Sequence, residues 1–544
     1  MVSPGTNATG TNDASPERVP DLEQAATRER AVGELISQFD RIAANGTRTV
    51  PARAFVSKYV SALTSAYTAG HAELSPKTRL ALINLLVSFD DPQTVPAHAK
   101  AILHYAMTGD GVDEAIWACR AAQTHKDDRL RAALLSAFEH VDMSEKHGLR
   151  FGTHLRGAML NNSTSSWSTL LIQKLRAPIA RPESFNDKPA VRSFQNQLFW
   201  QTTAAELLGD LRDDSAARPL FLARLDKTKR DVHAQAEVSL IKLGRASALV
   251  AETLLTAADR ELVDMSKLAE PEVKEPHIFF AADLLGKLGT PRSRDALIQA
   301  WDQTSDRVSR ALLAQALNQL PPDAASLELW KKTYLTTTLD TTLPGGESAL
   351  EVLAEGAPFW FNSELVPWLG QRAEAAPGKG SRKGDLQRSL VVAMGHLVTA
   401  EDAKEAYGVA QLVGGRTGTP AFEHARALAT SCGNEVSCYM KHVATPEDQT
   451  GERSIIATKS AVMIGILGSN ASGALLLKVA ASVEDPAVQA TLARAIEQLA
   501  KPGDTALVLE LERAVQSAKK NKSPRADDSG PSPLELTYYR LRAR

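Results

Sequence analysis

The residues of clearest chemical interest are two cysteines, Cys432 and Cys438, which lie six positions apart in the sequence. Gly433 and Asn434 between them are typical of a turn, so a short helix–turn–helix can bring the two sulfurs together. We therefore expect a local disulfide, with two unrelated free thiols as the alternative. A disulfide would place the protein outside the cytosol. The third cysteine, Cys119, lies in an apolar helical stretch and is expected to be a small buried hydrophobic residue.

A second group of candidate residues is basic and surrounds the dipeptide Pro377-Gly378. Such a segment could bind a phosphate or another anionic group. Basic loops that contain glycine are also common on protein surfaces, and no strand–helix context follows this one. We therefore expect a mobile surface loop, with anion binding as the alternative. The five residues are Arg372, Lys379, Arg382, Lys383 and Arg388.

The sequence lacks the common signatures of catalysis. It contains no nucleophile elbow, no phosphate-binding loop and no dinucleotide-binding fingerprint. It also has no CxxC pair and no cysteine–histidine cluster with the usual zinc-binding spacing. We therefore predict no catalytic, cofactor-binding or metal-binding residues, and no cofactor.

The composition predicts a large helical protein. A chain of 544 residues is too long for one ordinary core, which favours several domains or an extended repeat array. The sequence is rich in Ala and Leu, and few segments alternate β-branched or aromatic residues with polar ones. The net charge of -2 gives the protein no overall electrostatic attraction to DNA or to an anionic membrane. We therefore expect no nucleic-acid partner. No apolar run reaches the roughly 20 residues of a membrane span.

An internal repeat organises the middle of the chain. The stretch Ala204–Leu211 returns as Ala281–Leu288, 77 positions later, which corresponds to two units of about 38 residues. Met394–Leu397 and Ile464–Leu467 place a glycine at the same point. Because this glycine falls near the end of a predicted helix, we expect it to let the paired helix approach closely.

These units resemble the HEAT-repeat family, including the HEAT-like units also called PBS-lyase repeats. The resemblance is clear over 190–320 and 386–515, and diffuse over 75–175 and 321–385. It implies an all-α fold: an α-solenoid of stacked antiparallel helix pairs, whose concave face binds other proteins. The residues that carry it are Ala205, Leu208, Gly209 and Leu211, then Ala282, Leu285, Gly286 and Leu288, then Ala461, Ile464, Gly465 and Leu467, and finally Asp485-Pro486-Ala487-Val488.

The domain organisation follows from this pattern and from composition. Both ends are rich in small and polar residues and are expected to be disordered. Within the tail, Leu534–Arg544 regains apolar residues and could dock on the array, dock on a partner or be disordered. The predicted segments are a leader or tether (1–20), N-terminal helical repeats (21–175), central HEAT-like repeats (190–320), an irregular helical segment with the basic loop (321–385), C-terminal HEAT-like repeats (386–516) and a flexible tail (517–544).

The functional prediction is a non-enzymatic scaffold for protein–protein interaction. The leader composition and the cysteine pair favour a bacterial envelope protein, periplasmic or a lipoprotein whose anchor lies outside this chain. The alternative is a cytoplasmic enzyme or cofactor-handling protein of the bilin-lyase kind, which shares these repeats. Di-iron hydroxylases of this architecture use His-Glu pairs as ligands, but none of the 12 histidines here is followed by Glu. The sequence does not indicate an oligomeric state.

Overall fold

The computed structural model describes residues 20–269, 276–343, 346–443, 452–483, 485–501, 503–521 and 531–543. The leader 1–20 therefore lies outside these residues, except for Pro20. Regular structure in the described part is helical, apart from one isolated bridge between Thr342 and Ser348. The prediction of an all-α protein is confirmed. The chain divides into two compact units, unit 1 (Met1–Leu211) and unit 2 (Arg212–Arg544), which are described separately.

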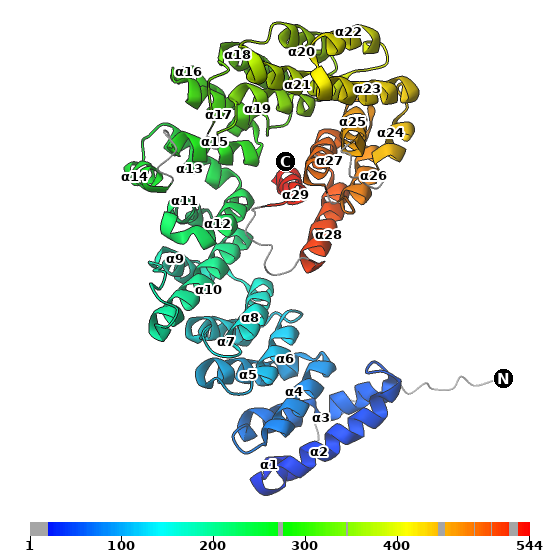
Figure 1. Cartoon of the computed structure of the whole chain (residues 1–544). Helices are drawn as coiled ribbons and strands as arrows, with labels where there is room; N and C mark the ends of the chain where they lie inside the picture. The colour runs from blue at the N-terminus through cyan, green and yellow to red at the C-terminus, as the bar shows by residue number, and fades with distance from the viewer. Residues whose placement is uncertain are drawn as a thin grey trace, which may run out of the picture. The chain divides into compact units, whose positions relative to one another are not determined.

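Unit 1 is a succession of helices in which most helices pack on the next one, on the next but one, or on both (Figure 1). Local sequence sets the helix starts. For example, the Ser75 hydroxyl accepts the Thr78 amide at 3.3 Å, and Pro76 occupies the first turn. The link 177–187 lies inside this unit. The helices are α1 (Pro20–Glu23), α2 (Ala25–Ile42), α3 (Val50–Gly70), α4 (Pro76–Phe89), α5 (Val95–Thr108), α6 (Val112–Ala122), α7 (Asp128–His140), α8 (Gly148–Asn162), α9 (Ser168–Arg176) and α10 (Lys188–Leu211), with 3-10 turns η1 (Ala43–Asn45), η2 (Pro92–Thr94) and η3 (Ser165–Trp167).

Most helices of unit 2 also pack on a near neighbour in the chain, and its last helix (Pro533–Ala543) contacts a helix near its start (Arg230–Leu243) (Figure 1). Its elements are η4 (Asp214–Ala216), α11 (Ala217–Leu225), η5 (Lys227–Lys229), α12 (Arg230–Leu243), α13 (Arg245–Leu255), α14 (Arg260–Ala269), α15 (Pro276–Leu288), α16 (Pro291–Gln303), α17 (Arg307–Leu317), α18 (Ala324–Thr336), α19 (Ala349–Gly356), η6 (Ala357–Trp360), α20 (Leu365–Glu374), α21 (Gly380–Leu397), α22 (Ala403–Val413), α23 (Gly415–Cys432), α24 (Val436–Val443), α25 (Glu452–Leu467), α26 (Asn470–Ala480), α27 (Pro486–Leu499), α28 (Thr505–Asn521) and α29 (Pro533–Ala543).

The repeated glycine permits a close approach, but not to the helix that we expected. A side-chain carbon added at Gly286 in α15 would lie 2.8 Å from the carbonyl oxygen of Ala316 in α17. One added at Gly395 in α21 would lie 3.3 Å from the Phe422 ring in α23. The predicted neighbours were the paired helices, α16 and α22. At Gly286 and Gly395 the missing side chain therefore brings the first helix of one pair against the first helix of the next pair, whereas a side-chain carbon at Gly465 in α25 would meet the ring of Phe361, directly after η6.

The segment 321–385 is mostly helical and has an aromatic cluster of its own. The Trp330 ring lies 6.0 Å from that of Trp360 and 5.4 Å from that of Trp368, measured between centroids. Trp330 is fully buried. The helix-breaking residues that make this sequence look irregular lie in the connections between α18 and α19 and between α19 and α20. These connections are long, but the helices themselves are retained.

The predicted flexible tail needs correction at both of its ends. Residues 517–521 continue α28, and residues 533–543 form α29. The residues between 521 and 531 lie outside the described part of the chain. Of the three alternatives for the final segment, the structure shows docking on the chain itself.

The described helices also bear on membrane insertion. None of them is at once long enough and apolar enough to span a bilayer. The prediction that the chain has no transmembrane segment is confirmed for those residues.

Candidate functional site

The last helix, α29, begins at a well-formed cap. The Ser532 hydroxyl accepts the Glu535 amide at 3.3 Å, and the Glu535 carboxylate accepts the Ser532 amide at 2.9 Å. This reciprocal pair is a capping box, and Pro533 in the first turn adds to it. The cap explains why a helix starts here, directly after a stretch of small and polar residues.

The α29 helix is buried in unit 2 on several sides, because the polar residues Glu535, Thr537 and Arg540 are buried as well as the apolar ones. Leu534, Tyr538, Tyr539 and Leu541 are each less than a tenth exposed. The helix contacts α27, α28 and α12, and Figure 1 shows it between α12 and α27. We call the surfaces of α12, α15, α27 and α28 that contact this helix the α29 site.

Arg540 is the polar centre of the α29 site. Its guanidinium group donates to the carbonyl oxygens of Gly286 and Lys287, each at 2.7 Å, and to the Glu497 carboxylate at 2.9 Å. The Gly286 and Lys287 carbonyls belong to the last turn of α15, where no helical amide is available to them. The Arg540 and Glu497 side chains are only 2% and 3% exposed. A cation at this end of a helix also interacts favourably with the helix dipole.

A second arginine, Arg494 in α27, makes the same kind of contact at the end of α17. It donates to the carbonyls of Asn318 at 2.7 Å and Leu320 at 2.8 Å, directly after α17, and also to that of Gln319. It lies 3.7 Å from Glu497 as well. Two arginines that share one buried carboxylate therefore hold the end of unit 2 against the helix ends of α15 and α17.

A further basic residue, Lys459 in α25, is fully buried. Its amino group donates to the carbonyl of His396 at 3.2 Å and to that of Val398, at the end of α21. Burial lowers the pKa of Lys459 well below its ordinary value. Burial, and then the nearby Lys459, lower the pKa of His396 to about 3, so this imidazole is neutral at pH 7.

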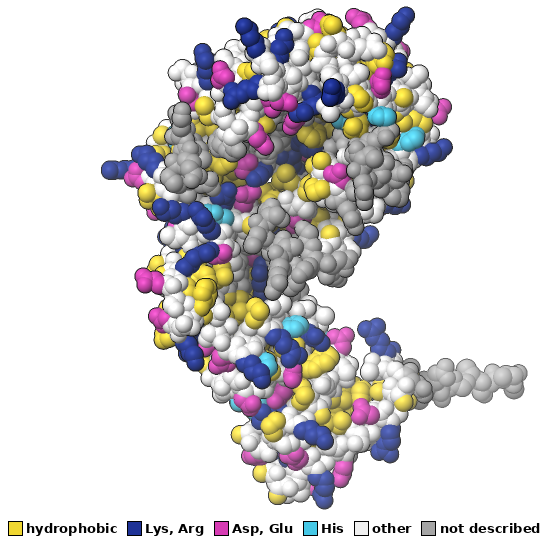
Figure 2. All heavy atoms as spheres, viewed as in Figure 1, with side chains coloured by type: hydrophobic (Ala, Val, Ile, Leu, Met, Phe, Trp, Pro, Cys, Tyr) yellow, Lys and Arg dark blue, Asp and Glu magenta, His cyan; other side chains and the backbone are white. Residues whose placement is uncertain are grey.

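A cavity of about 490 Å³ opens beside the α29 site, between η6, α21, α25 and α27. Its size lies in the range of ligand pockets. Nδ1 of His396 is buried and has no hydrogen-bond partner among the described residues. Figure 2 shows a hollow in the surface of unit 2 with hydrophobic side chains inside it. The lining combines the apolar residues Phe359, Val392 and Ile455 with the hydroxyls of Ser389, Thr458 and Thr491.

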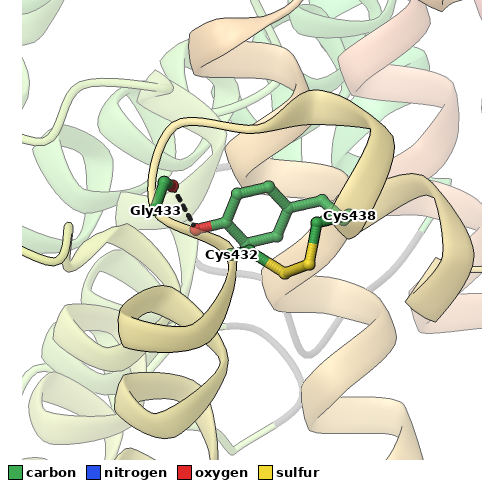
Figure 3. Close-up of a disulfide and its surroundings, with 4 residues drawn as sticks. Cys432, Gly433 and Cys438 are labelled. Atoms are coloured by element: carbon green, nitrogen blue, oxygen red, sulfur yellow. Dashed lines mark hydrogen bonds between the residues drawn. A yellow bond between two sulfur atoms is a disulfide. The ribbon is translucent and has the colours of Figure 1, made fainter.

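The two cysteines predicted to pair are joined in the structure (Figure 3). Cys432 ends α23 and Cys438 lies in α24, with 5.4 Å between their Cα atoms. Gly433 provides the turn with a φ of +54°. The third cysteine, Cys119, is buried and free, as the sequence indicated.

The predicted basic loop is shorter than expected. Arg372 lies in the last turn of α20, Lys379 directly precedes α21, and the other three residues lie on α21, so only 375–379 connects the two helices. Arg382 pairs with Asp340 at 3.2 Å and Arg388 with Asp385 at 3.3 Å. The five cations are therefore spread from the end of α20 to the first half of α21, and Arg382 and Arg388 have carboxylate partners.

Unit 1 contains a separate buried polar cluster around Glu114. The Glu114 carboxylate accepts the Tyr67 hydroxyl at 2.5 Å and the Arg79 guanidinium at 3.1 Å, and His71 lies 3.6 Å away. Burial opposes ionisation of Glu114, but its contacts with His71, Tyr67 and Arg79 outweigh burial and lower its pKa. The cluster joins α3, α4 and α6 by charge as well as by apolar packing.

Comparison of the sequence with models of known protein families and with curated proteins finds no match to either. The argument for function therefore depends on the sites described above. Sequence analysis did not identify Arg540, Arg494, Glu497 or Lys459. The capping box at Ser532 was a readable signal for α29, whereas nothing near Arg540 in sequence indicates its two carbonyl partners, which lie more than 250 residues away.

Proposed function

We propose that this protein is a scaffold for protein–protein interaction, built as a HEAT-like α-solenoid whose inner surface binds a partner. The support for the architecture is the packing of first helices of successive pairs, as between α15 and α17 at Gly286 and between α21 and α23 at Gly395. Repeat proteins of this kind bind over extended surfaces made by several repeats.

The observation that carries the proposal is the docking of α29. Four helices of unit 2 surround α29, bury its apolar side chains together with Glu535 and Thr537, and bind its arginine. This is the helix-in-groove mode of peptide recognition. A partner helix with the same pattern, apolar side chains on one face and an arginine aimed at Glu497, fits the same contacts. In this proposal the chain's own helix and the partner compete for the α29 site.

The proposed location is the bacterial envelope, with a lipoprotein-type anchor outside this chain. The support is the bond between Cys432 and Cys438, because disulfides persist in oxidising compartments. The test is the mass of the non-reduced protein from its native host after alkylation under denaturing conditions. One added label, on Cys119, is expected. Three labels would remove the support for export.

The binding proposal is tested with a labelled peptide of residues 531–543. Fluorescence anisotropy follows its titration with the wild-type protein and with the full-length variant Arg540→Ala. In the variant the resident helix is released, so the peptide is expected to bind. In the wild type the site is occupied, so binding is expected to be weaker by at least about tenfold, because the tethered helix has a high effective concentration.

Two altered peptides provide the controls. A peptide with Arg540→Ala should not bind the variant protein. A peptide with Arg542→Ala should bind almost as well as the natural one, because within the described part of the chain the hydrogen bond and cation–π contacts of Arg542 are with Tyr538 and Tyr539 of its own helix. If no peptide binds the variant while its circular dichroism remains that of a folded helical protein, the α29 site does not recognise helices in trans, and the proposal fails.

A further inference from the structure

Three potential metal ligands converge at the cysteine pair in unit 2. The sulfurs of Cys432 and Cys438 and a ring nitrogen of His442 all lie within 4.8 Å of one another. Cys438 and His442 are four positions apart on α24, so both project from the same face of that helix. Cys432 reaches them from the end of α23 across the turn at Gly433 (Figure 3). The three ligands form the pattern Cys-x5-Cys-x3-His. The two cysteines are further apart in sequence than in common zinc motifs.

The arrangement of these residues has supports other than the bond between the sulfurs. The Tyr439 hydroxyl donates to the Gly433 carbonyl at 3.0 Å, and the Tyr439 ring is fully buried. The Glu435 amide donates to the Cys432 carbonyl at 3.0 Å, and the Cys438 amide donates to the Glu435 carbonyl at the same distance. Because these contacts hold the turn, reduction of the disulfide leaves the two sulfurs close together.

The third ligand is accessible. Cys432 is buried, whereas Cys438 and His442 are partly exposed. The His442 ring makes no hydrogen bond to any other described residue, and a ring nitrogen lies within 4.8 Å of both sulfurs. Partial exposure also leaves room for water as a fourth ligand.

We propose that the reduced form of this segment binds one zinc ion through Cys432, Cys438 and His442, with water completing a tetrahedral site. Two thiolates and an imidazole form a donor set that suits zinc. Calcium and magnesium are instead bound by oxygen donors. With Zn–S distances of about 2.3 Å, tetrahedral geometry needs the sulfurs about 3.8 Å apart, a modest separation once their bond is broken.

The chemistry balances in two steps. A dithiol reductant supplies two electrons and two protons to the disulfide, which becomes two thiols, and the reductant itself becomes a disulfide. Zinc then displaces one proton from each thiol, so two protons are released for each ion bound. The disulfide and the metal site use the same sulfurs and exclude each other. The inference does not depend on the proposed scaffold function.

Cobalt(II) alone is a suitable probe, because it occupies zinc sites and absorbs visible light. The full-length protein is reduced, freed of reductant under anaerobic conditions and titrated. We expect one equivalent to bind, with thiolate-to-cobalt charge-transfer bands and the strong visible bands of tetrahedral cobalt, all removed by added zinc. The oxidised protein should show none of these bands.

Two variants separate this site from other thiols. His442→Ala, which keeps both cysteines, should weaken cobalt binding by at least about tenfold, since even the loss of a supporting group has an effect of this size. Cys119→Ser removes the buried free thiol of unit 1 and should change nothing. Circular dichroism checks that each reduced variant is folded. The proposal is overturned if reduced, folded wild-type protein gives no tetrahedral cobalt spectrum, or if His442→Ala binds cobalt as tightly as the wild type.

Discussion

Replacement of Arg540 by alanine should release α29 from unit 2. Arg540 donates three hydrogen bonds while almost completely buried, one of them to the Glu497 carboxylate. Removing one partner of a buried ion pair costs about 3–5 kcal/mol. Arg494, 3.7 Å from Glu497, compensates part of the remaining charge, so we expect a loss of about 3–4 kcal/mol.

The docking of α29 depends on the hydrogen bonds of Arg540, because the free energy gained from apolar burial is nearly cancelled by the entropy cost of ordering the helix. Burial of Leu534, Tyr538, Tyr539 and Leu541 contributes about 1.5–3 kcal/mol for each side chain. Ordering the backbone of the 11 residues of α29 costs about 1 kcal/mol or more for each residue. The two totals have similar size, so the hydrogen bonds of Arg540 decide whether the helix is docked.

Hydrogen exchange measured by mass spectrometry follows this equilibrium in the full-length chain. In Arg540→Ala, exchange of the amides of residues 533–543 should become at least about 100-fold faster, because each 1.4 kcal/mol changes an equilibrium tenfold. The matched control is Arg542→Ala, which removes the same charge from the same helix but loses only contacts with Tyr538 and Tyr539. Its effect should stay below about 1 kcal/mol. Equal exchange rates in the two variants would refute the role assigned to Arg540.

Three further predictions concern other buried groups and are measured by chemical denaturation. Glu114→Gln should destabilise unit 1 by about 3 kcal/mol at pH 7 by breaking a buried ion pair with Arg79. Because the folded pKa of Glu114 is lowered, its contribution is present above the unfolded pKa and fades as the pH falls through the folded value. The stabilities of the wild type and the variant should therefore converge as the solution is acidified, and a constant difference would contradict this. Because the pKa of Lys459 is lowered in the folded protein, the unfolded amine holds a proton that the folded one releases. The free energy of unfolding should therefore rise by up to about 1.4 kcal/mol for each pH unit toward pH 9. Lys459→Met should lack that rise, and an equal pH dependence in the wild type and the variant would contradict this prediction. Replacing Cys432 and Cys438 by serine should lower the stability of unit 2 by about 2 kcal/mol under non-reducing conditions, as expected for a short disulfide loop, whereas no change would indicate that the bond does not constrain the unfolded chain.

Features encoded by neighbouring residues could be predicted from the sequence. The turn at Gly433 and Asn434 placed two cysteines within reach of each other, and both lie at helix ends in the structure. Helix starts such as Ser75-Pro76 followed from the chemistry of caps. The capping box at Ser532 was equally local, but the surrounding small and polar residues led to the expectation of a flexible tail.

Features that depend on distant residues could not be predicted in this way. Arg540 looks like any charged residue of an exposed helix until α15 is known to end beside it. Lys459 falls in an apolar stretch, and its two carbonyl partners lie more than 60 residues earlier. The repeated glycine was identified correctly as a close approach, but the identity of its neighbour depends on how helix pairs stack, which local periodicity does not encode.

The most direct test of the central claim locates α29 in solution by cross-linking. A photoreactive phenylalanine analogue replaces Tyr539, whose ring lies 5.7 Å from the amino group of Lys242 in α12. After illumination at low protein concentration, the account predicts cross-links within one molecule, to tryptic peptides of α12 and of the neighbouring helices α27 and α28. Cross-links that form only between molecules, or that map to unit 1, would contradict the claim that the α29 site holds the chain's own last helix.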